Sequence, residues 1–249
     1  METIESAIKS KGKIGKILLL GAASLIILIT LANVIWKSSG SNEWELEIDK
    51  NGTRVYTLKS PGNNMILVKG VTKWKYTLSQ CVAPFFDESI QDDPGKWLPM
   101  CTEYKILKQQ RFQGLQTNLQ LYKWDFPFPF SPREVLVQGQ VNQDPETKEI
   151  MLENIAVQNA IPRTDGYVRT GHHHNIWRFI PQENGEVRVE FLMDMTFDGF
   201  FPDMITNISG ASQVFKILSE DYPKLMVNYQ NTKFDFIEEP ASTTASIAK

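Results

Sequence analysis

The sequence predicts an α+β fold in which antiparallel strands are followed by a long amphipathic C-terminal helix, with one apolar helix ahead of the domain. Apolar residues alternate with polar ones over most of residues 53–197, helical periodicity follows Pro202, and residues 17–36 contain no charged side chain. The composition agrees, because 42% hydrophobic and 22% charged residues in a chain of 249 make an ordinary globular mixture. Collagen-like, wholly disordered and disulfide-scaffold proteins are therefore excluded.

The first predicted element is an apolar segment of 20 residues, Ile17 to Trp36. As a helix it is long enough to cross the hydrocarbon core of a bilayer. Lysines precede it within residues 1–16 and acidic residues follow it, so we expect a cytoplasmic N-terminus and a domain on the other side, in a periplasm, a lumen or the exterior. A cleaved signal peptide has the same pattern, and a cytosol-facing domain also stays open.

The rest of the chain divides by composition. Residues 37–42 (KSSGSN) read as a short flexible linker, residues 43–237 as one domain, and residues 238–249 (EEPASTTASIAK) as a disordered tail with too little apolar surface to order. The net charge is -3, and beyond residue 16 the sequence has no long basic run. Nucleic acid is therefore not an expected partner.

Strands are predicted where every second residue is apolar between turn signals. The clearest run is 187–197, which places Val187, Val189, Phe191, Met193, Met195 and Phe197 on one face. Further strands are expected at 53–58, 65–75, 102–112, 118–126, 134–141, 149–158 and 175–181. Their order is consistent with an antiparallel meander.

Two helices are expected in the domain. A short one follows Thr77, with Pro84 limiting its length. The longer one begins near Pro202 and is interrupted at Asp221-Tyr222-Pro223. The residues KLMVNYQ after Pro223 are expected to add another turn or two. One apolar stripe runs along the longer helix, formed by Ile205, Ile208, Ala211, Phe215 and Leu218.

Several short motifs follow one another along the domain in a characteristic order. They are WELEIDKNGTRVYT from Trp44, Lys69-Gly70, Trp97, PFPFSPRE from Pro127, Gly166-Tyr167-Val168-Arg169 after Pro162, Trp177 with Pro181, and TFDGFFP from Thr196. In this order they resemble the START (StAR-related lipid transfer) domain family, and the pair PFPFSPRE and GYVR is the most specific part. The resemblance implies a helix-grip fold, in which a curved antiparallel sheet wraps the C-terminal helix and encloses a tunnel for one lipid.

The resemblance also implies a function: binding one sterol, phospholipid or similar lipid and moving it between membranes without chemical change. The lid is then the helix from Pro202 with the loop 194–201, opening at a membrane surface, with Gly199 and Gly210 as hinges. A tethered lipid sensor without transfer is the alternative within the family. No protein partner is indicated.

The residues expected to line the tunnel come from the apolar strand faces, the helix stripe and the family motifs. They are Tyr122, Trp124, Tyr167, Arg169, Trp177, Phe191, Met193, Met195, Met204, Ile205, Ile208 and Phe215. The same pattern is also that of a solid core. Several sterol and ceramide binders of the family carry a charged pair in the cavity, but Gln138 or Gly139 stands where its arginine is expected, so the polar contact to the ligand is expected to be uncharged or elsewhere.

No enzyme activity and no cofactor are expected, because GxSxG, P-loop and GxGxxG motifs are absent from the sequence. A helix-grip cyclase or hydrolase is the alternative, using one of His172, His173 and His174 with Asp194 and a serine. These histidines are expected at a surface loop or strand edge, since no HExxH or nearby cysteine completes a metal site. Cys81 is expected as a buried thiol, and a disulfide with Cys101 stays open.

Overall fold

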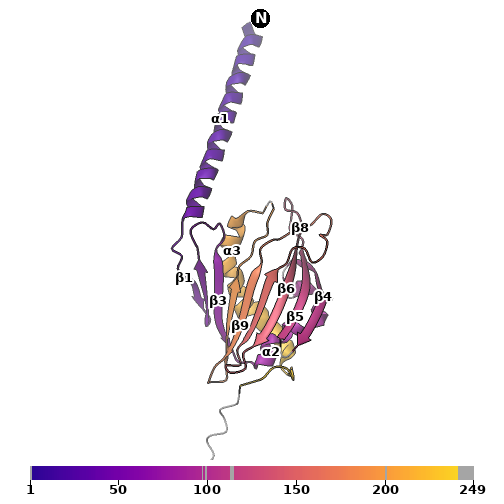
Figure 1. Cartoon of the computed structure of the whole chain (residues 1–249). Helices are drawn as coiled ribbons and strands as arrows, with labels where there is room; N and C mark the ends of the chain where they lie inside the picture. The colour runs from indigo at the N-terminus through magenta and orange to yellow at the C-terminus, as the bar shows by residue number, and fades with distance from the viewer. Residues whose placement is uncertain (1, 97, 99, 113–114, 200, 241–249) are drawn as a thin grey trace, which may run out of the picture. The chain divides into compact units, whose positions relative to one another are not determined.

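The computed structural model describes residues 2–96, 98, 100–112, 115–199 and 201–240. It confirms the expected fold: a large antiparallel sheet is followed by the C-terminal helix α3 (Asp203–Lys216), and the sheet is open because its path ends on β1 at one edge and β4 at the other (Figure 1). Trp97 and residues 241–249 of the expected tail lie outside the described residues.

The chain forms two compact units, and the first comprises the N-terminal 43 residues with Lys59–Asn64. Its helix α1 (Glu2–Ser38) contains an apolar stretch, Leu19–Ser38, long and apolar enough to cross a membrane. A signal sequence near an N-terminus has the same properties. Within this unit the indole Nε1 of Trp36 donates a hydrogen bond to the Asn64 carbonyl at 2.8 Å. The helix α1 ends at Ser38, two residues after the end of the predicted apolar segment at Trp36.

The second unit holds the sheet. Its strands are β1 (Glu45–Lys50), β2 (Thr53–Leu58), β3 (Leu67–Trp74), β4 (Cys101–Phe112), β5 (Leu115–Trp124), β6 (Arg133–Gln143), β7 (Ile150–Ala156), β8 (Val168–Arg169), β9 (His174–Pro181) and β10 (Val187–Met193). All the predicted strands are confirmed, with ends shifted by a few residues. β1 was missed because it is an exposed edge strand, and the two-residue β8 is too short to show a period.

The strand order is β1-β2-β3-β10-β9-β7-β6-β5-β4, with β8 paired in parallel to β6. The prediction of an antiparallel meander is wrong at the connection between β3 and β4, because β3 pairs with β10 rather than with β4. The predicted strand 187–197 also stops early. After Met193 the backbone N–H of Asp194 donates to the Asn175 side chain at 3.1 Å, and only Met195 still bridges to His173.

The short helix expected after Thr77 is confirmed as α2 (Leu78–Val82). Thr77 and Gln80 form a capping box, in which each side chain accepts a hydrogen bond from the other's backbone N–H. Pro84 lies in the following turn η1 (Ala83–Phe86), and two further turns follow, η2 (Glu88–Gln91) and η3 (Pro94–Lys96). This helical segment places Phe85 over the sheet.

The regular C-terminal helix is interrupted before Pro223, and the further turns expected after it are present. After α3 come a π-helical turn η4 (Ile217–Asp221), α4 (Tyr222–Met226) and η5 (Val227–Tyr229). Pro223 is tolerated because it lies in the first turn of α4, where its missing N–H is not needed for a regular helix bond.

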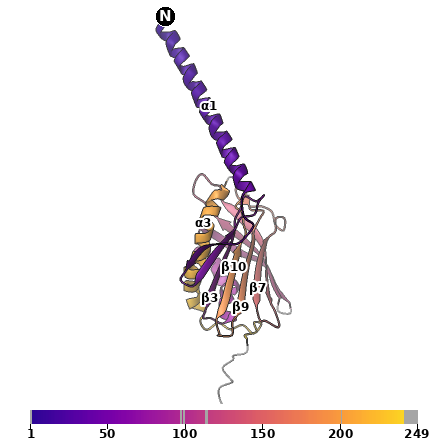
Figure 2. The ribbon, with the colours of Figure 1, turned by 90° about the vertical axis from the view of Figure 1, so that its left-hand side faces the viewer.

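One face of the sheet, here called the inner face, is covered by α2, η1, α3, η4 and α4. Figure 2 shows α3 lying along the β3 side of the sheet. Gly70 of β3 permits this approach, because a Cβ there would lie 2.3 Å from Leu218 Cδ1 and 2.6 Å from Val214 Cγ1. The core between the layers includes Val55, Val68, Trp74, Trp177, Phe179, Val189, Phe191, Val214, Leu218 and Tyr222.

The predicted domain boundary at residue 237 cuts through an ordered contact. The Glu239 carboxylate accepts the backbone N–H groups of Leu78 and Ser79, at 2.9 and 2.8 Å, at the start of α2. The backbone N–H of Glu238 donates to Gln143 at 2.8 Å. These first residues of the predicted tail therefore belong to the domain.

Candidate functional site

A row of polar residues crosses the inner face of the sheet. The strand register pairs Asn118 of β5 with Gly139 of β6, Gly139 with Asn154 of β7, and Asn154 with Asn175 of β9. Directly paired residues point to the same side of a sheet, so these side chains share a face. The buried inner face is therefore polar in its middle, although most of its surroundings are apolar.

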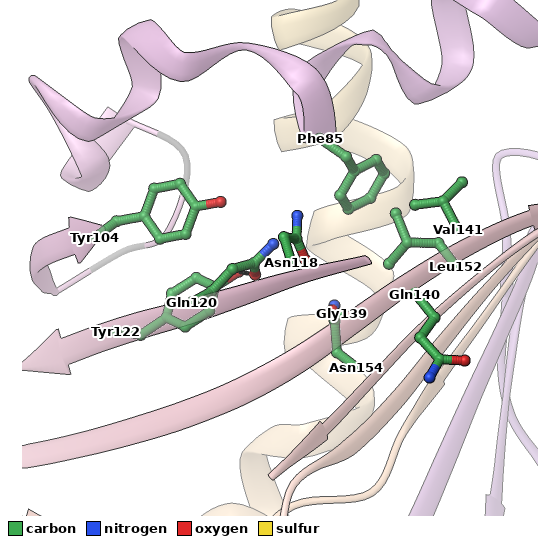
Figure 3. Close-up of a pocket in the computed structure, with 10 residues that line it drawn as sticks. All are labelled: Phe85, Tyr104, Asn118, Gln120, Tyr122, Gly139, Gln140, Val141, Leu152 and Asn154. Atoms are coloured by element: carbon green, nitrogen blue, oxygen red, sulfur yellow. Dashed lines mark hydrogen bonds between the residues drawn. The ribbon is translucent and has the colours of Figure 1, made fainter. Parts of the chain in front are cut away.

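A small cavity lies at this row, between the sheet and Phe85 (Figure 3). Its lining residues are Phe85, Tyr104, Asn118, Gln120, Tyr122, Gly139, Gln140, Val141, Leu152 and Asn154. The space available to the centre of a water-sized sphere is about 10 Å³, enough for about one water molecule. The side chains around this cavity thus leave room for little more than water, and a larger molecule fits here only if neighbouring elements move apart.

Gly139 is required at the centre of the row. A Cβ there would lie 2.2 Å from Oδ1 of Asn118 and 2.9 Å from Oδ1 of Asn154. Both carboxamides therefore converge over the glycine from the strands on either side. Only a residue without a side chain leaves room for them.

Two tyrosines extend the polar row. The rings of Tyr104 and Tyr122 lie 4.7 Å apart, and the Tyr122 hydroxyl donates a hydrogen bond to the Gln120 side chain. Burial raises the pKa of both phenols far above the usual value. Both hydroxyls therefore stay protonated and keep a donor.

Next to the polar row the inner face is aromatic. Trp177 stacks on Phe191 at 4.2 Å, and Phe85 meets Trp177 edge-on at 5.6 Å. Tyr222 of α4 packs on Trp177 at 5.2 Å and on Phe85 at 5.8 Å. These rings pack against one another as part of the core between the sheet and the helices.

One end of the domain is closed by a cluster of four phenylalanines, which we call the Phe latch: Phe126, Phe130, Phe197 and Phe201. Phe201, just before α3, lies 5.0 Å from Phe126 and 4.9 Å from Phe130, ring centre to ring centre. The latch therefore joins the β5–β6 loop to the start of α3. It is held together mainly by contacts between rings.

Arg133 fixes the latch to the sheet. Its guanidinium lies 5.5 Å from the ring centre of Phe201 and donates hydrogen bonds to the carbonyls of Phe197 and Asp198, at 3.1 and 3.0 Å. A third bond goes to the Ser131 carbonyl. One side chain thus ties both halves of the latch to β6.

Some of the predicted lining residues lie on the inner face. Trp177, Phe191 and Tyr122 are buried there, Trp124 stacks on Tyr122, and Met193 faces Gly210 of α3. Phe215 is half-buried against the core, and Met195 is half-buried at its bridge to His173.

Arg169 and Tyr167 do not line the interior, which corrects the expectation for both. Arg169 forms an ion pair of 2.8 Å with Glu134, next to the inner-face residue Val135 and thus on the opposite face of β6. It also donates to the carbonyls of Gln158, Ile161 and Pro162. Its role is to hold the loop after β7. Tyr167 lies outside as well, with its ring 5.1 Å from Nζ of Lys123.

Met204, Ile205 and Ile208 are also not part of the closed interior. They are 65%, 40% and 74% exposed. The buried residues of α3 are Gly210, Ala211 and Val214, all of which follow these three positions in the helix. Gly210 lies in the regular helix α3 and allows close packing against Val68 and Met193, so its backbone shows no hinge. Gly199, the other expected hinge, has a left-handed φ of 61°.

The sequence interpretation missed the polar members of the interior: Tyr104, Asn118, Gln120, Asn154 and Asn175. A signal existed for two of them. Tyr122 and Trp124 were placed on the inner face, so the period of two puts Asn118 and Gln120 there as well. They were overlooked because amides are usually placed on the solvent side of a strand.

The histidines form separate contacts. Nε2 of His172 lies 2.6 Å from Asp194 Oδ1, and Nε2 of His174 lies 2.7 Å from Glu153 Oε1. His172 is exposed as expected, whereas His174 is half-buried at the start of β9, a strand inside the sheet. His173 between them is buried, and burial lowers its pKa to about 4. Among the described residues no group of three metal-binding side chains is found. Cys81 is buried as expected, and both it and Cys101 are free thiols.

The curved open sheet with a helix across its inner face, closed at one end by a loop-to-helix latch, defines a helix-grip protein. The START domain family model matches residues 30–228, so the chain belongs to the START domain family. In sequence, an uncharacterized protein of Pseudomonas aeruginosa is 23% identical over 190 residues, which are 74% of this chain and 88% of that protein.

Solved structures agree with the fold. A STAR-related lipid transfer protein from Xanthomonas axonopodis superimposes with a TM-score of 0.63 and 20% identity, covering 73% of this chain and 98% of that one. Human StAR-related lipid transfer protein 5 gives 0.59 and 16%, covering 84% and 97%. Human STARD10 gives 0.63 and 14%, covering 78% and 76%. Membership of the START family supports lipid binding as the general function.

Proposed function

We propose that this chain binds one lipid in its interior and moves it, chemically unchanged, between its own membrane and a neighbouring one. The observation that carries the proposal is a set of exposed apolar side chains at the end closed by the Phe latch. Phe128 is 97% exposed in the loop between Phe126 and Phe130, and Met204 and Ile208 follow Phe201 on α3. Exposed apolar groups at one end of a domain are typical of a surface that docks on a membrane.

The lipid enters the domain where the Phe latch opens. Rings that pack against one another in water gain little from that contact once a bilayer offers an equally apolar environment. Docking of Phe128 and the first turns of α3 therefore loosens the latch at the place where the lipid must enter. The cavity at the polar row is too small for a lipid, so the proposal requires an opening there. In this proposal α3 and the loop 194–201 are the elements that move.

The N-terminal helix supports tethering. With α1 in a bilayer, the linker keeps the donor membrane within reach of the domain and raises the rate of encounters. The lysines before the apolar segment favour a cytoplasmic N-terminus and a domain on the non-cytoplasmic side.

A disulfide that locks α3 to the sheet tests the proposal. A Cβ on Gly210 would lie 3.1 Å from Cγ2 of Val68 and more than 4 Å from the Cβ of Val68. This is near the upper end of the Cβ separation of about 3.5–4.5 Å that a disulfide needs. The full chain with Val68→Cys and Gly210→Cys is reconstituted into donor vesicles that hold a radiolabelled total lipid extract of its host. Arrival of label in phosphatidylcholine acceptor vesicles is then measured.

We expect label to move at the protein-free background rate in the oxidised variant, and at nearly the wild-type rate after reduction. The matched controls are the variants that carry only one of the two added cysteines, beside the native Cys81 and Cys101. Transfer at the wild-type rate by the oxidised protein, with the disulfide confirmed by mass, would overturn the lid. Binding without transfer by the wild type would instead identify a sensor, and a modified lipid in the acceptor an enzyme.

A further inference from the structure

We infer that the interior recognises the uncharged polar group of a neutral lipid, a hydroxyl or an amide, through the carboxamides of Asn118 and Asn154. The inference rests on the proposed function and names the chemistry of the ligand. It follows from three properties of the polar row: the missing partners of the two carboxamides, the space between them, and the charge of the lining.

Asn118 is only 6% exposed and faces the cavity. Among the described residues neither its carboxamide nor that of Asn154 has a side-chain hydrogen-bond partner in the protein, although both converge over Gly139. Asn154 is half-buried, and neither carboxamide belongs to the fully buried polar groups that lack a hydrogen bond, because both border the free space of the cavity. Two amides that face one free space without a side-chain bond to the protein form a site that a water molecule or a polar group of a ligand completes.

The shape of the cavity fits a small polar group. Its free space of about 10 Å³ lies between the carboxamides and the ring of Phe85 (Figure 3). This space takes one water molecule, and a hydroxyl has the same size and the same ability to donate and accept. Each carboxamide offers both a donor and an acceptor, and Tyr104 and Tyr122 add phenolic hydroxyls at the same wall.

The uncharged lining of the cavity disfavours ionic head groups. None of the cavity-lining residues that the structure describes is charged. A phosphate placed there would lose its hydration without gaining a cation, and burial of an unpaired charge is far more costly than burial of a hydroxyl. The aromatic surface around Trp177 then receives the apolar body of the ligand. A sterol, a diacylglycerol or a ceramide fits this description.

Photo-crosslinking with the full chain tests the inference. The chain is reconstituted into phosphatidylcholine vesicles that hold diazirine-bearing cholesterol, diacylglycerol, ceramide or phosphatidylglycerol. Labelled peptides of β5, β6 and β7 are quantified against probe concentration. The variants are Asn118→Leu and Asn154→Leu, and the matched control is Asn142→Leu, because Asn142 lies on β6 and is exposed.

We expect at least one of the three neutral probes to label the inner-face peptides and phosphatidylglycerol to label them much less. Removing one hydrogen bond of about 1–1.5 kcal/mol should raise the half-saturating concentration about tenfold in each variant and leave the Asn142→Leu control unchanged. A thermal unfolding curve monitors folding. Should Asn118→Leu fail to fold, the less buried Asn154→Leu decides.

Equal labelling by phosphatidylglycerol, or variants that match the control, would overturn the inference while leaving lipid carriage intact. Labelling of the inner face by none of the probes, including the phosphatidylcholine analogue added as a further arm, would count against both the inference and the proposed function.

Discussion

The indole Nε1 of Trp74 donates a hydrogen bond to the backbone carbonyl of Leu218 at 3.3 Å, across the contact between β3 and the C-terminal helix. The carbonyl is available because of the π-helical turn. In this turn the N–H of Tyr222 bonds to the Ile217 carbonyl, and the next residue, Pro223, has no N–H to give to Leu218. The stacked rings of Trp74 and Tyr222, 4.9 Å apart, reinforce the same junction. The C-terminal end of the helical layer is thus fixed to the sheet. Its N-terminal end follows the Phe latch and is joined to the start of β3 by the Asn207 side chain, which accepts the backbone N–H of Ile66 at 3.0 Å.

The first prediction concerns this junction. Trp74→Phe should destabilise the domain by about 2–4 kcal/mol, because the Leu218 carbonyl loses its partner in a buried position and the smaller ring leaves space. Pro223→Ala restores a backbone N–H near that carbonyl, so the cost of Trp74→Phe should be smaller in the Pro223→Ala background. A double-mutant cycle from urea unfolding measures the coupling. Strict additivity of the two changes would show that the proline does not free the carbonyl.

The second prediction concerns the buried ion pair on the other face of β6. Glu134 is 0% exposed, so Arg169→Met leaves its carboxylate without its cation and releases the loop carbonyls at residues 158, 161 and 162. We expect a loss of about 3–5 kcal/mol in the free energy of unfolding. Adding Glu134→Gln should recover part of this loss. Wild-type stability of Arg169→Met would contradict the assignment of Arg169 as the anchor of the loop after β7.

The third prediction is that acidic pH lowers the stability of the folded domain. Burial lowers the pKa of His173 from 6.5 to about 4, and the charges of His172 and His174 act in the same direction. The unfolded chain therefore binds a proton at a higher pH than the folded chain, and the domain loses stability as the pH falls from about 6.5 toward 4. The full loss amounts to about 3 kcal/mol.

Equilibrium unfolding between pH 7.5 and 4.5 checks this prediction on the full chain. His173→Phe should flatten the pH dependence, whereas the exposed His172→Gln should retain most of it. An unchanged slope in His173→Phe would assign the acid sensitivity to other groups.

The fourth prediction concerns the latch. Phe201→Ala removes the ring that contacts both Phe126 and Phe130, so the end of the domain should open more often. In the vesicle assay described above we expect faster transfer of labelled lipid with a moderately lower melting temperature. Phe128→Ala should do the reverse, since it removes an exposed docking group but no latch contact: slower transfer at unchanged stability. Equal effects of the two changes would contradict the division between latch and docking surface.

Much of the fold could be predicted from the sequence because one face of most strands is buried. In β10 the alternation of Val187, Val189 and Phe191 determines which side faces the core. The pairing of β3 with β10 could not be read in this way, since a period says which face is buried but not which strand lies alongside. The edge strand β1 escaped because neither of its faces is buried.

The candidate site was predictable in its apolar half only. Trp177 and Phe191 follow from the alternation, whereas Ile208 and Met204 were misplaced because a helix stripe does not reveal how far the helix extends beyond its contact with the sheet. Arg169 was misplaced because the face of a two-residue strand cannot be read from a period. Asn118 and Asn154 became visible as one site only when the register placed both beside Gly139.

The most direct test of the account is the chemical content of the interior. A protease site is inserted into residues 39–42 of the full chain, the folded domain is released from the purified protein, and its organic extract is analysed by mass spectrometry. The account predicts one neutral, hydroxyl- or amide-bearing lipid per domain, which Asn118→Leu reduces. A well-folded domain that carries no lipid, even after incubation with vesicles of its host's total lipids, would contradict it.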